Sequence, residues 1–176
     1  MSTPPIVCVI GKKKSGKTTT VVGLVKELTT RGYVVMTVKH GHDFRLDREH
    51  TDSWRHRHHG GAGRVVLAGP NQFAVMGDWP ASVEQPLEAL VADHLADADI
   101  VVAEGYKASD LPKIEVFRRA AHAESLIGTG SCSEAAYVAV LTDVPDFSAD
   151  VPVLSVDGPD RFERLADLVE TLLLAG

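Results

Sequence analysis

Short apolar runs alternate along the chain with segments whose apolar residues recur at helical spacing. In residues 18–31, Val21, Leu24, Val25 and Leu28 fall on one face of a helix. The same pattern predicts helices at 52–59, at a segment opened by a capping box of Ser82 and Gln85, and at a last segment capped by Asp160 with Glu163. The expected strands are residues 6–10, 33–38, 64–68, 72–76, 100–103, 114–117, 136–141 and 151–156.

Continuous apolar strands between amphipathic helices are typical of a parallel sheet that helices cover on both faces. The sequence therefore predicts an α/β fold with a mostly parallel central sheet, in which residues 64–68 and 72–76 are candidates for a hairpin. The chain has 176 residues, and no repeat or linker divides it. We expect a single domain over residues 1–176.

Charge is distributed unevenly along the chain. Residues 1–64 hold 12 Lys and Arg against 5 Asp and Glu, whereas residues 65–176 hold 6 against 19. The net charge of −6 argues against a general nucleic-acid binder, but the basic first third indicates an anionic ligand. No apolar run is long enough for a membrane span, and residues 1–10 lack the features of a secretory signal, so we expect a cytoplasmic protein.

The strongest motif covers residues 11–18, the phosphate loop, which matches the Walker A pattern G-x-x-x-x-G-K-[ST] in full. It follows an apolar strand and opens a helix, as a P-loop NTPase fold of three layers requires. Backbone N–H groups of such a loop surround phosphates, Lys17 reaches the β- and γ-phosphates, and the Thr18 hydroxyl binds Mg²⁺. The expected nucleotide-binding residues are Gly11, Lys12, Lys14, Ser15, Gly16, Lys17, Thr18 and Thr19.

Three carboxylates are candidates for the remaining roles at a nucleotide site. Glu104 ends the strand 100–103, where a Mg²⁺-binding carboxylate is usual, although it could be a surface group. Asp43 follows the second strand and could meet the metal or an attacking water, or form a loop turn. The chain has no N-K-x-D guanine signature; Asp143, at a strand end, is either the base-reading acceptor or a cap.

Six of the eight histidines lie between residues 40 and 59. One interpretation is a metal site, because imidazoles bind zinc, copper and nickel, and His56 and His59 could share a helix face. The other is a polar loop that faces an anionic ligand or a partner. No cysteine accompanies the histidines, which favours the second interpretation.

Several ordered blocks are similar to the molybdopterin-guanine dinucleotide biosynthesis protein B (MobB) family. They are the phosphate loop, Thr-Val-Lys-His at 37–40, Asp47 with Asp-Ser-Trp-Arg at 52–55, Ala-Glu-Gly-Tyr-Lys at 103–107, Pro-Lys-Ile-Glu-Val-Phe-Arg at 112–118 and Thr-Asp-Val-Pro at 142–145. The resemblance covers residues 5–174. It implies a homodimeric GTP-binding protein with slow hydrolysis, which works beside a MobA-type guanylyltransferase that joins GMP to the molybdenum cofactor.

Carried onto this chain, the resemblance implies that Thr18 and Glu104 hold Mg²⁺ and that residues 39–53 form a switch-like loop. Lys17 would neutralise phosphoryl charge, and Asp43 or Asp47 would position water. A surface toward the molybdopterin phosphate or a partner would contain Lys39, His40, Lys107, Lys113 and Arg118. The alternatives are a histidine-rich metallochaperone GTPase, a small-molecule kinase, and a non-catalytic adaptor that presents GTP or the cofactor.

Overall fold

The computed structural model describes residues 3–41, 46–79, 83–130 and 136–175. The chain forms two compact units, a large unit of residues 1–40 and 87–176 and a small unit of residues 41–86. In the sequence, the small unit is thus inserted between two segments of the large unit. Each unit is described by itself.

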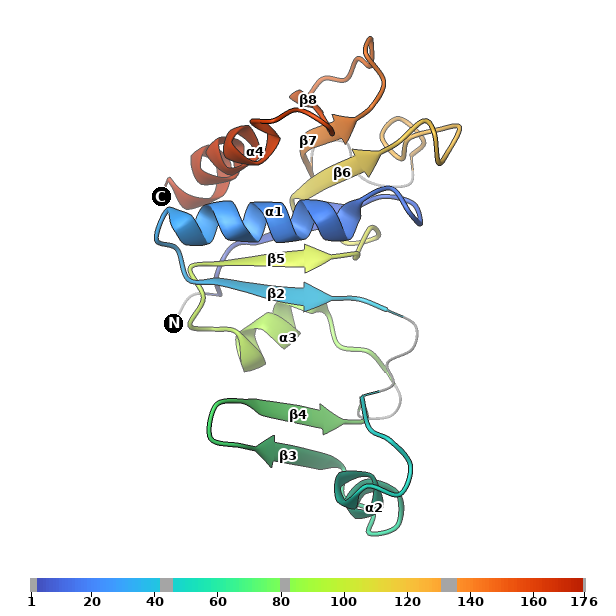
Figure 1. The fold of residues 1–176 in the computed structure, drawn as a ribbon, viewed down its shortest axis with the longest axis vertical. Coiled ribbons are helices and arrows are strands. Elements are labelled where there is room, and N and C mark those ends of the chain that lie inside the picture. Colours follow the sequence, from blue (N-terminus) through green and yellow to red (C-terminus); the bar gives the residue numbers. More distant parts are fainter. Residues whose placement is uncertain (1–2, 42–45, 80–82, 131–135, 176) are drawn as a thin grey trace. The chain divides into compact units, whose positions relative to one another are not determined.

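A sheet of six parallel strands forms the centre of the large unit (Figure 1). The strands are β1 (Ile6–Ile10), β2 (Val35–Lys39), β5 (Ile100–Glu104), β6 (Lys113–Phe117), β7 (Tyr137–Thr142) and β8 (Val153–Ser155). Their order in the sheet is β2-β5-β1-β6-β7-β8, and every neighbouring pair is parallel. The predicted α/β fold is confirmed, and the strand that leads into the phosphate loop lies in the interior of the sheet.

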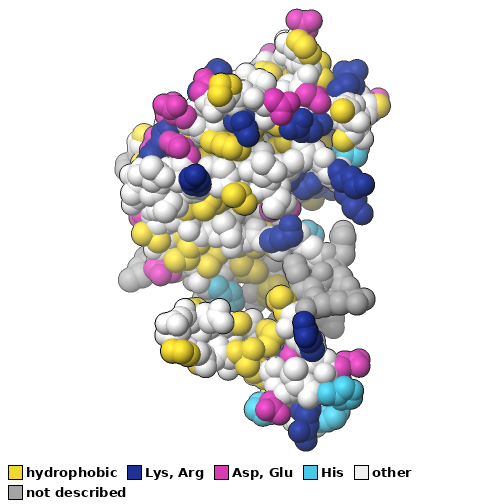
Figure 2. Space-filling view, viewed as in Figure 1, with side chains coloured by type: hydrophobic (Ala, Val, Ile, Leu, Met, Phe, Trp, Pro, Cys, Tyr) yellow, Lys and Arg dark blue, Asp and Glu magenta, His cyan; other side chains and the backbone are white. Residues whose placement is uncertain are grey.

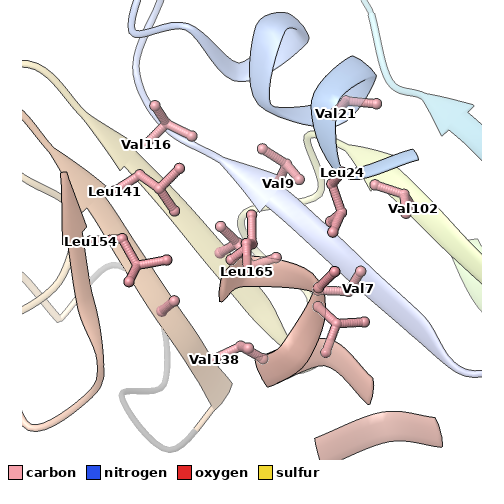
Figure 3. Packing of buried hydrophobic residues seen from close by; sticks show 14 of the residues in the cluster. Val7, Val9, Val21, Leu24, Val102, Val116, Val138, Leu141, Leu154 and Leu165 are labelled. Atoms are coloured by element: carbon pink, nitrogen blue, oxygen red, sulfur yellow. The ribbon is translucent and has the colours of Figure 1, made fainter. Parts of the chain in front are cut away.

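Helices cover both faces of this sheet. They are α1 (Lys17–Thr30), α3 (Leu87–His94) and α4 (Arg161–Val169), which continues into a π-helical turn over Glu170–Leu174. Successive residues of a strand point to opposite faces. Val7 and Val9 of β1 therefore pack with Leu24 of α1 and Leu165 of α4 (Figure 3), whereas Cys8 packs on the side of α3.

The small unit contains one helix and one hairpin. Helix α2 (Asp52–His58) is capped by Thr51, whose side chain accepts a hydrogen bond from the backbone N–H of Trp54. Strands β3 (Arg64–Ala68) and β4 (Phe73–Gly77) pair antiparallel, which confirms the predicted hairpin. Among the described residues of the whole chain, no helix is long and apolar enough to cross a membrane.

Both predicted helix caps differ from what the structure shows. Helix α3 begins at Leu87, so Gln85 precedes the helix, and Ser82 lies outside the described residues. Asp160 does precede α4, but its side chain makes no capping hydrogen bond. Its ψ of 6° departs from the extended backbone that directs a capping oxygen toward the first turn.

Candidate functional site

The phosphate loop joins the carboxyl end of β1 to the start of α1 with three residues of positive φ: Gly11 (146°), Lys14 (64°) and Gly16 (102°). A side chain at Gly11 would collide with the carbonyl oxygen of Val116 on β6. These dihedrals turn the loop back on itself, so that its backbone N–H groups and those of the first helical turn are available to one anion.

A cavity of about 390 Å³ lies over this loop and the start of α1. It is lined by Lys13, Lys14, Gly16, Lys17, Thr18, Thr19 and Glu104. Most of the predicted phosphate-binding residues thus line one cavity, together with the predicted metal carboxylate. The hydroxyl of Ser15, a loop residue that does not line the cavity, is buried and has no hydrogen-bond partner among the described residues.

Lys17 is held inside the loop. Its Nζ donates a hydrogen bond to the backbone carbonyl of Lys12 at 2.8 Å. Partial burial lowers the pKa of Lys17, and the negative charge of Glu104 opposes that shift. The ammonium group therefore has a weak, neutral partner that an anionic oxygen could replace.

Glu104 lies where two strand ends and the start of α1 meet. It is directly opposite Lys39 in the pairing of β2 with β5, and Lys39 Nζ donates to Glu104 Oε1 at 2.8 Å. Thr18 Oγ1 donates to Glu104 Oε2 at 2.9 Å. Burial alone would raise the pKa of Glu104, but the hydrogen bonds from Lys39 and Thr18 and the nearby positive charges lower it below its ordinary value. An ionised carboxylate beside a hydroxyl is an oxygen donor pair that suits Mg²⁺.

Asp143 lies on the other flank of the phosphate loop, after β7. Its Oδ1 accepts a hydrogen bond from the backbone N–H of Arg119 at 2.7 Å, and it lies outside the cavity lining. The turn after β6 is also tied to the phosphate loop itself, because His122 Nε2 lies 2.5 Å from the carbonyl oxygen of Lys13. The base-reading role of Asp143 stays a prediction.

The prediction that Lys113 lies on a surface toward the pterin phosphate or a partner is wrong. Strand β6 lies between β1 and β7, and Lys113 is fully buried. Its ammonium group donates to the backbone carbonyls of Ser109 and Leu111. A buried ammonium group is tolerated when carbonyl oxygens accept its hydrogen bonds. Lys113 therefore orders the loop after β5 and offers no charge to a partner.

Two other residues of the expected surface, Lys107 and His40, are not buried as Lys113 is. Lys107 is exposed after β5, and the ring of His40 packs against Tyr106 with 4.9 Å between centroids.

The sequence did not predict the role of Glu115, a buried carboxylate on β6. It accepts hydrogen bonds from the backbone N–H groups of Leu126 and Ile127 at 2.6 and 2.9 Å. Burial raises its pKa, against the effect of these hydrogen bonds. A charged residue within an apolar strand was the available signal.

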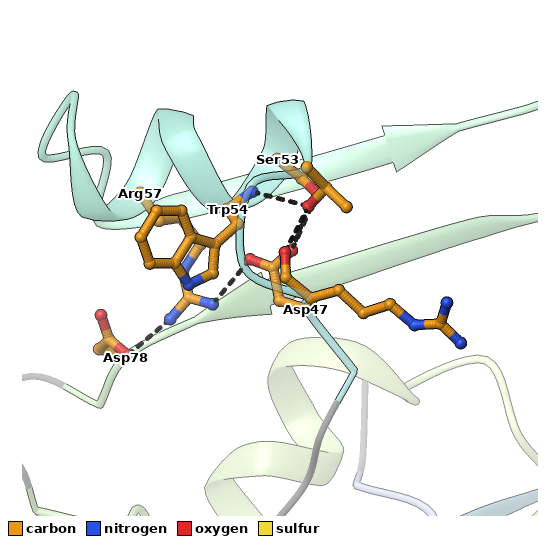
Figure 4. Close-up of polar contacts among 7 residues, drawn as sticks. Asp47, Ser53, Trp54, Arg57 and Asp78 are labelled. Carbon is orange, nitrogen blue, oxygen red and sulfur yellow. Dashed lines mark hydrogen bonds and ion pairs between the residues drawn. The ribbon is translucent and has the colours of Figure 1, made fainter.

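Asp47 belongs to a polar network inside the small unit (Figure 4). It accepts hydrogen bonds from Ser53 at 2.9 Å, from Thr51 at 3.3 Å and from Arg57 at 3.4 Å. Arg57 also donates to Asp78, after β4, at 2.6 Å. Because its oxygens already have three donors, Asp47 has a structural role in the small unit, which does not favour the prediction that it positions water. Asp43 lies outside the described residues.

Replacing Arg57 with alanine should destabilise the small unit by about 2 kcal/mol, because the buried carboxylate of Asp47 loses its positive partner. Only 11% of the Arg57 side chain is exposed. Hydrogen exchange of residues 46–79 measures the effect. Arg55→Ala, at an exposed position of the same helix, is the matched control and should change little. Equal protection in the two variants would contradict the structural role.

Three histidines of the small unit lie around a tryptophan. The rings of His50, His58 and His59 lie 5.8, 4.7 and 5.0 Å from that of Trp54, measured between centroids. Among the described residues, no group of three or more His, Cys, Asp or Glu side chains could hold a metal ion. His42 lies outside the described residues, and those described provide no ligand set for the metallochaperone alternative.

A parallel sheet between two helical layers, with the motif loop between β1 and α1, defines an α/β protein of the P-loop fold. The family model described as "MobB: Molybdopterin guanine dinucleotide synthesis protein B" matches residues 6–143. This chain belongs to that family.

Two curated relatives carry the name molybdopterin-guanine dinucleotide biosynthesis adapter protein. The one from Haemophilus influenzae is 30% identical over 170 residues, which cover 96% of this chain and 89% of the relative. The one from Escherichia coli is 30% identical over 169 residues, covering 94% and 91%.

Solved structures agree on the fold. A crystal structure of molybdopterin-guanine biosynthesis protein B (mobB) matches with a TM-score of 0.69 at 24% identity, over 96% of this chain and 99% of that one. A MobB homologue from Bacillus stearothermophilus matches with a TM-score of 0.66, also at 24% identity, over 94% and 98%.

Proposed function

We propose that this chain binds GTP with Mg²⁺ on its phosphate loop and acts as an adapter in the assembly of molybdopterin guanine dinucleotide. The observation that carries the nucleotide part is the cavity over the loop, where Lys17, Thr18 and Glu104 come together. The adapter part is supported by family membership and by the names of the two curated relatives.

Each group of the site would contact a different part of a bound GTP–Mg²⁺ complex. The N–H groups of the phosphate loop receive the phosphate oxygens, and Lys17 exchanges the carbonyl of Lys12 for the β- and γ-phosphates. Thr18 and Glu104 provide oxygen ligands for Mg²⁺, which when bound neutralises charge on the phosphates. Oδ1 of Asp143 accepts the hydrogen bond from Arg119, and its Oδ2 is the proposed acceptor for the guanine N–H groups.

The proposed partners are a guanylyltransferase of the MobA type, molybdopterin, and a second copy of this chain. Lys39, His40 and Lys107 remain the proposed surface toward the pterin phosphate. Self-association is supported by apolar side chains on the hairpin of the small unit, where Phe73 is 77% exposed and Val66 is 60% exposed. Exposed apolar surface of this kind commonly marks an interface.

Single-turnover hydrolysis of bound GTP, with and without the guanylyltransferase, tests the adapter role. We expect the chain alone to hydrolyse GTP slowly, on the order of 10⁻⁴ to 10⁻² s⁻¹, as GTPases do without an arginine supplied in trans. The described residues of the cavity include no arginine and no carboxylate besides Glu104. Hydrolysis by the chain alone at about 1–100 s⁻¹ would contradict the proposal, and rapid phosphoryl transfer to a metabolite would revive the kinase alternative.

A further inference from the structure

Different charged side chains lie on the two sides of the phosphate loop. Lys39 and Glu104 are the last residues of β2 and β5, and Glu104 lines the cavity where the metal and the terminal phosphates would be held. Beyond β6, on the opposite side of β1, lies Arg118, directly after the strand. If the terminal phosphates of a nucleotide lie near Glu104, its nucleoside end can extend toward the opposite side of β1, where Arg118 lies.

Arg118 lies against the phosphate loop. A β-carbon built on Gly16 would be 3.7 Å from Arg118 Nε, so the guanidinium group lies beside the residue whose backbone begins the α1 anion site. The position of its backbone is fixed, because the next residue donates its N–H to Asp143 and His122 contacts the Lys13 carbonyl. Only the side chain of Arg118 needs to move for the group to change partners.

In the structure the guanidinium group is directed to a carboxylate instead of to the loop. Its two terminal nitrogens donate to the two oxygens of Asp157, after β8, at 3.3 and 2.9 Å. The hydrogen bond from Arg118 lowers the pKa of Asp157, and the same contact raises that of Arg118. The side chains of Arg118 and Asp157 are 32% and 68% exposed, so water screens this ion pair. Breaking it therefore costs little free energy.

We propose that Arg118 is a latched nucleotide ligand: Asp157 holds its guanidinium group in the nucleotide-free protein, and the group transfers to the phosphates nearest the nucleoside when a nucleotide binds. The inference rests on the proposed function and adds a residue and a competing carboxylate to that site. A guanidinium group binds phosphate through two parallel hydrogen bonds, and a polyphosphate carries more charge than one exposed carboxylate. The exchange of partners therefore favours the nucleotide.

A latch and a simple structural ion pair make different predictions for removing each partner. If Asp157 competes with the nucleotide, Asp157→Asn should tighten GTP binding by about twofold to fivefold, the range of an exposed ion pair. Arg118→Ala should weaken it by about tenfold, as expected for a lost charge-assisted hydrogen bond. In the double variant the gain from Asp157→Asn should disappear, because the group that it releases is absent.

The test is titration of the purified full chain with GTP and Mg²⁺ for wild type, the two single variants and the double variant. Asp167→Asn is the matched control, because Asp167 is an exposed partner of Arg31 in the same unit, at 2.7 Å, and should leave the affinity unchanged. Weaker or unchanged binding in Asp157→Asn would overturn the latch while wild-type binding persists. Absence of GTP binding in the wild type would instead overturn the proposed function.

Discussion

Replacing Lys17 with alanine should abolish measurable GTP binding, with a loss of affinity of at least about a hundredfold. In the proposed site, Lys17 is the cavity lysine expected to reach the β- and γ-phosphates, and its present partner is a neutral carbonyl. Charge-assisted hydrogen bonds to phosphate are the strongest single contacts expected at this site. Calorimetric or fluorescence titration with GTP and Mg²⁺ measures the loss.

Lys26→Ala is the matched control for that variant. Lys26 is an exposed lysine on the same helix and lies outside the cavity over the phosphate loop. Its removal changes the net charge by the same amount and should leave GTP affinity within about twofold, because exposed charges are screened. Unchanged affinity in Lys17→Ala would exclude the phosphate loop as the binding site.

Glu104→Gln should remove the dependence of GTP binding on Mg²⁺. The carboxylate is ionised, since hydrogen bonds and nearby cations lower its pKa, whereas an amide is a poor ligand for a hard cation. We expect the affinity measured with Mg²⁺ to fall about tenfold or more, to that of the metal-free protein, while binding without metal changes little. The measurement is a pair of GTP titrations, with Mg²⁺ and with a chelator.

Variants of Thr18 complete this test of the metal site. Thr18→Val should repeat the effect of Glu104→Gln, because it removes the hydroxyl that lies 2.9 Å from the carboxylate. Thr18→Ser keeps that hydroxyl and should retain most of the Mg²⁺ effect. If Glu104→Gln and Thr18→Val respond to Mg²⁺ as strongly as the wild type, these two residues do not hold the metal.

Local patterns predicted most of the fold. The bounds of β3 agree with the sequence pattern, and α1 begins and ends within one residue of the expected positions, because periodicity and flanking glycines are local signals. Helix α3 shows the limit. The spacing of Ser82 and Gln85 predicts a capping box at its start, but the helix begins only at Leu87. Two residues with the right spacing do not fix the backbone conformation that a cap requires.

The sequence does not reveal contacts at the site whose partners are distant in sequence or are backbone carbonyls. Lys113 looked like surface charge because a strand pattern does not reveal that carbonyl oxygens satisfy its ammonium group. The pairing of Asp47 with Arg57 depends on how the small unit folds, and the water-positioning role of Asp47 stays a prediction. The contact of Arg118 with Asp157 joins the ends of β6 and β8, so it follows from the strand order and not from a motif.

The central claim is that the cavity over the phosphate loop holds GTP with Mg²⁺, and equilibrium binding of GTP and ATP, each with and without Mg²⁺, tests it most directly. We expect GTP to bind about tenfold or more tightly than ATP, because a base-reading carboxylate such as Asp143 is left without donors when adenine replaces guanine. We also expect Mg²⁺ to strengthen binding. A preference for ATP, or GTP binding that is indifferent to Mg²⁺, would contradict the account.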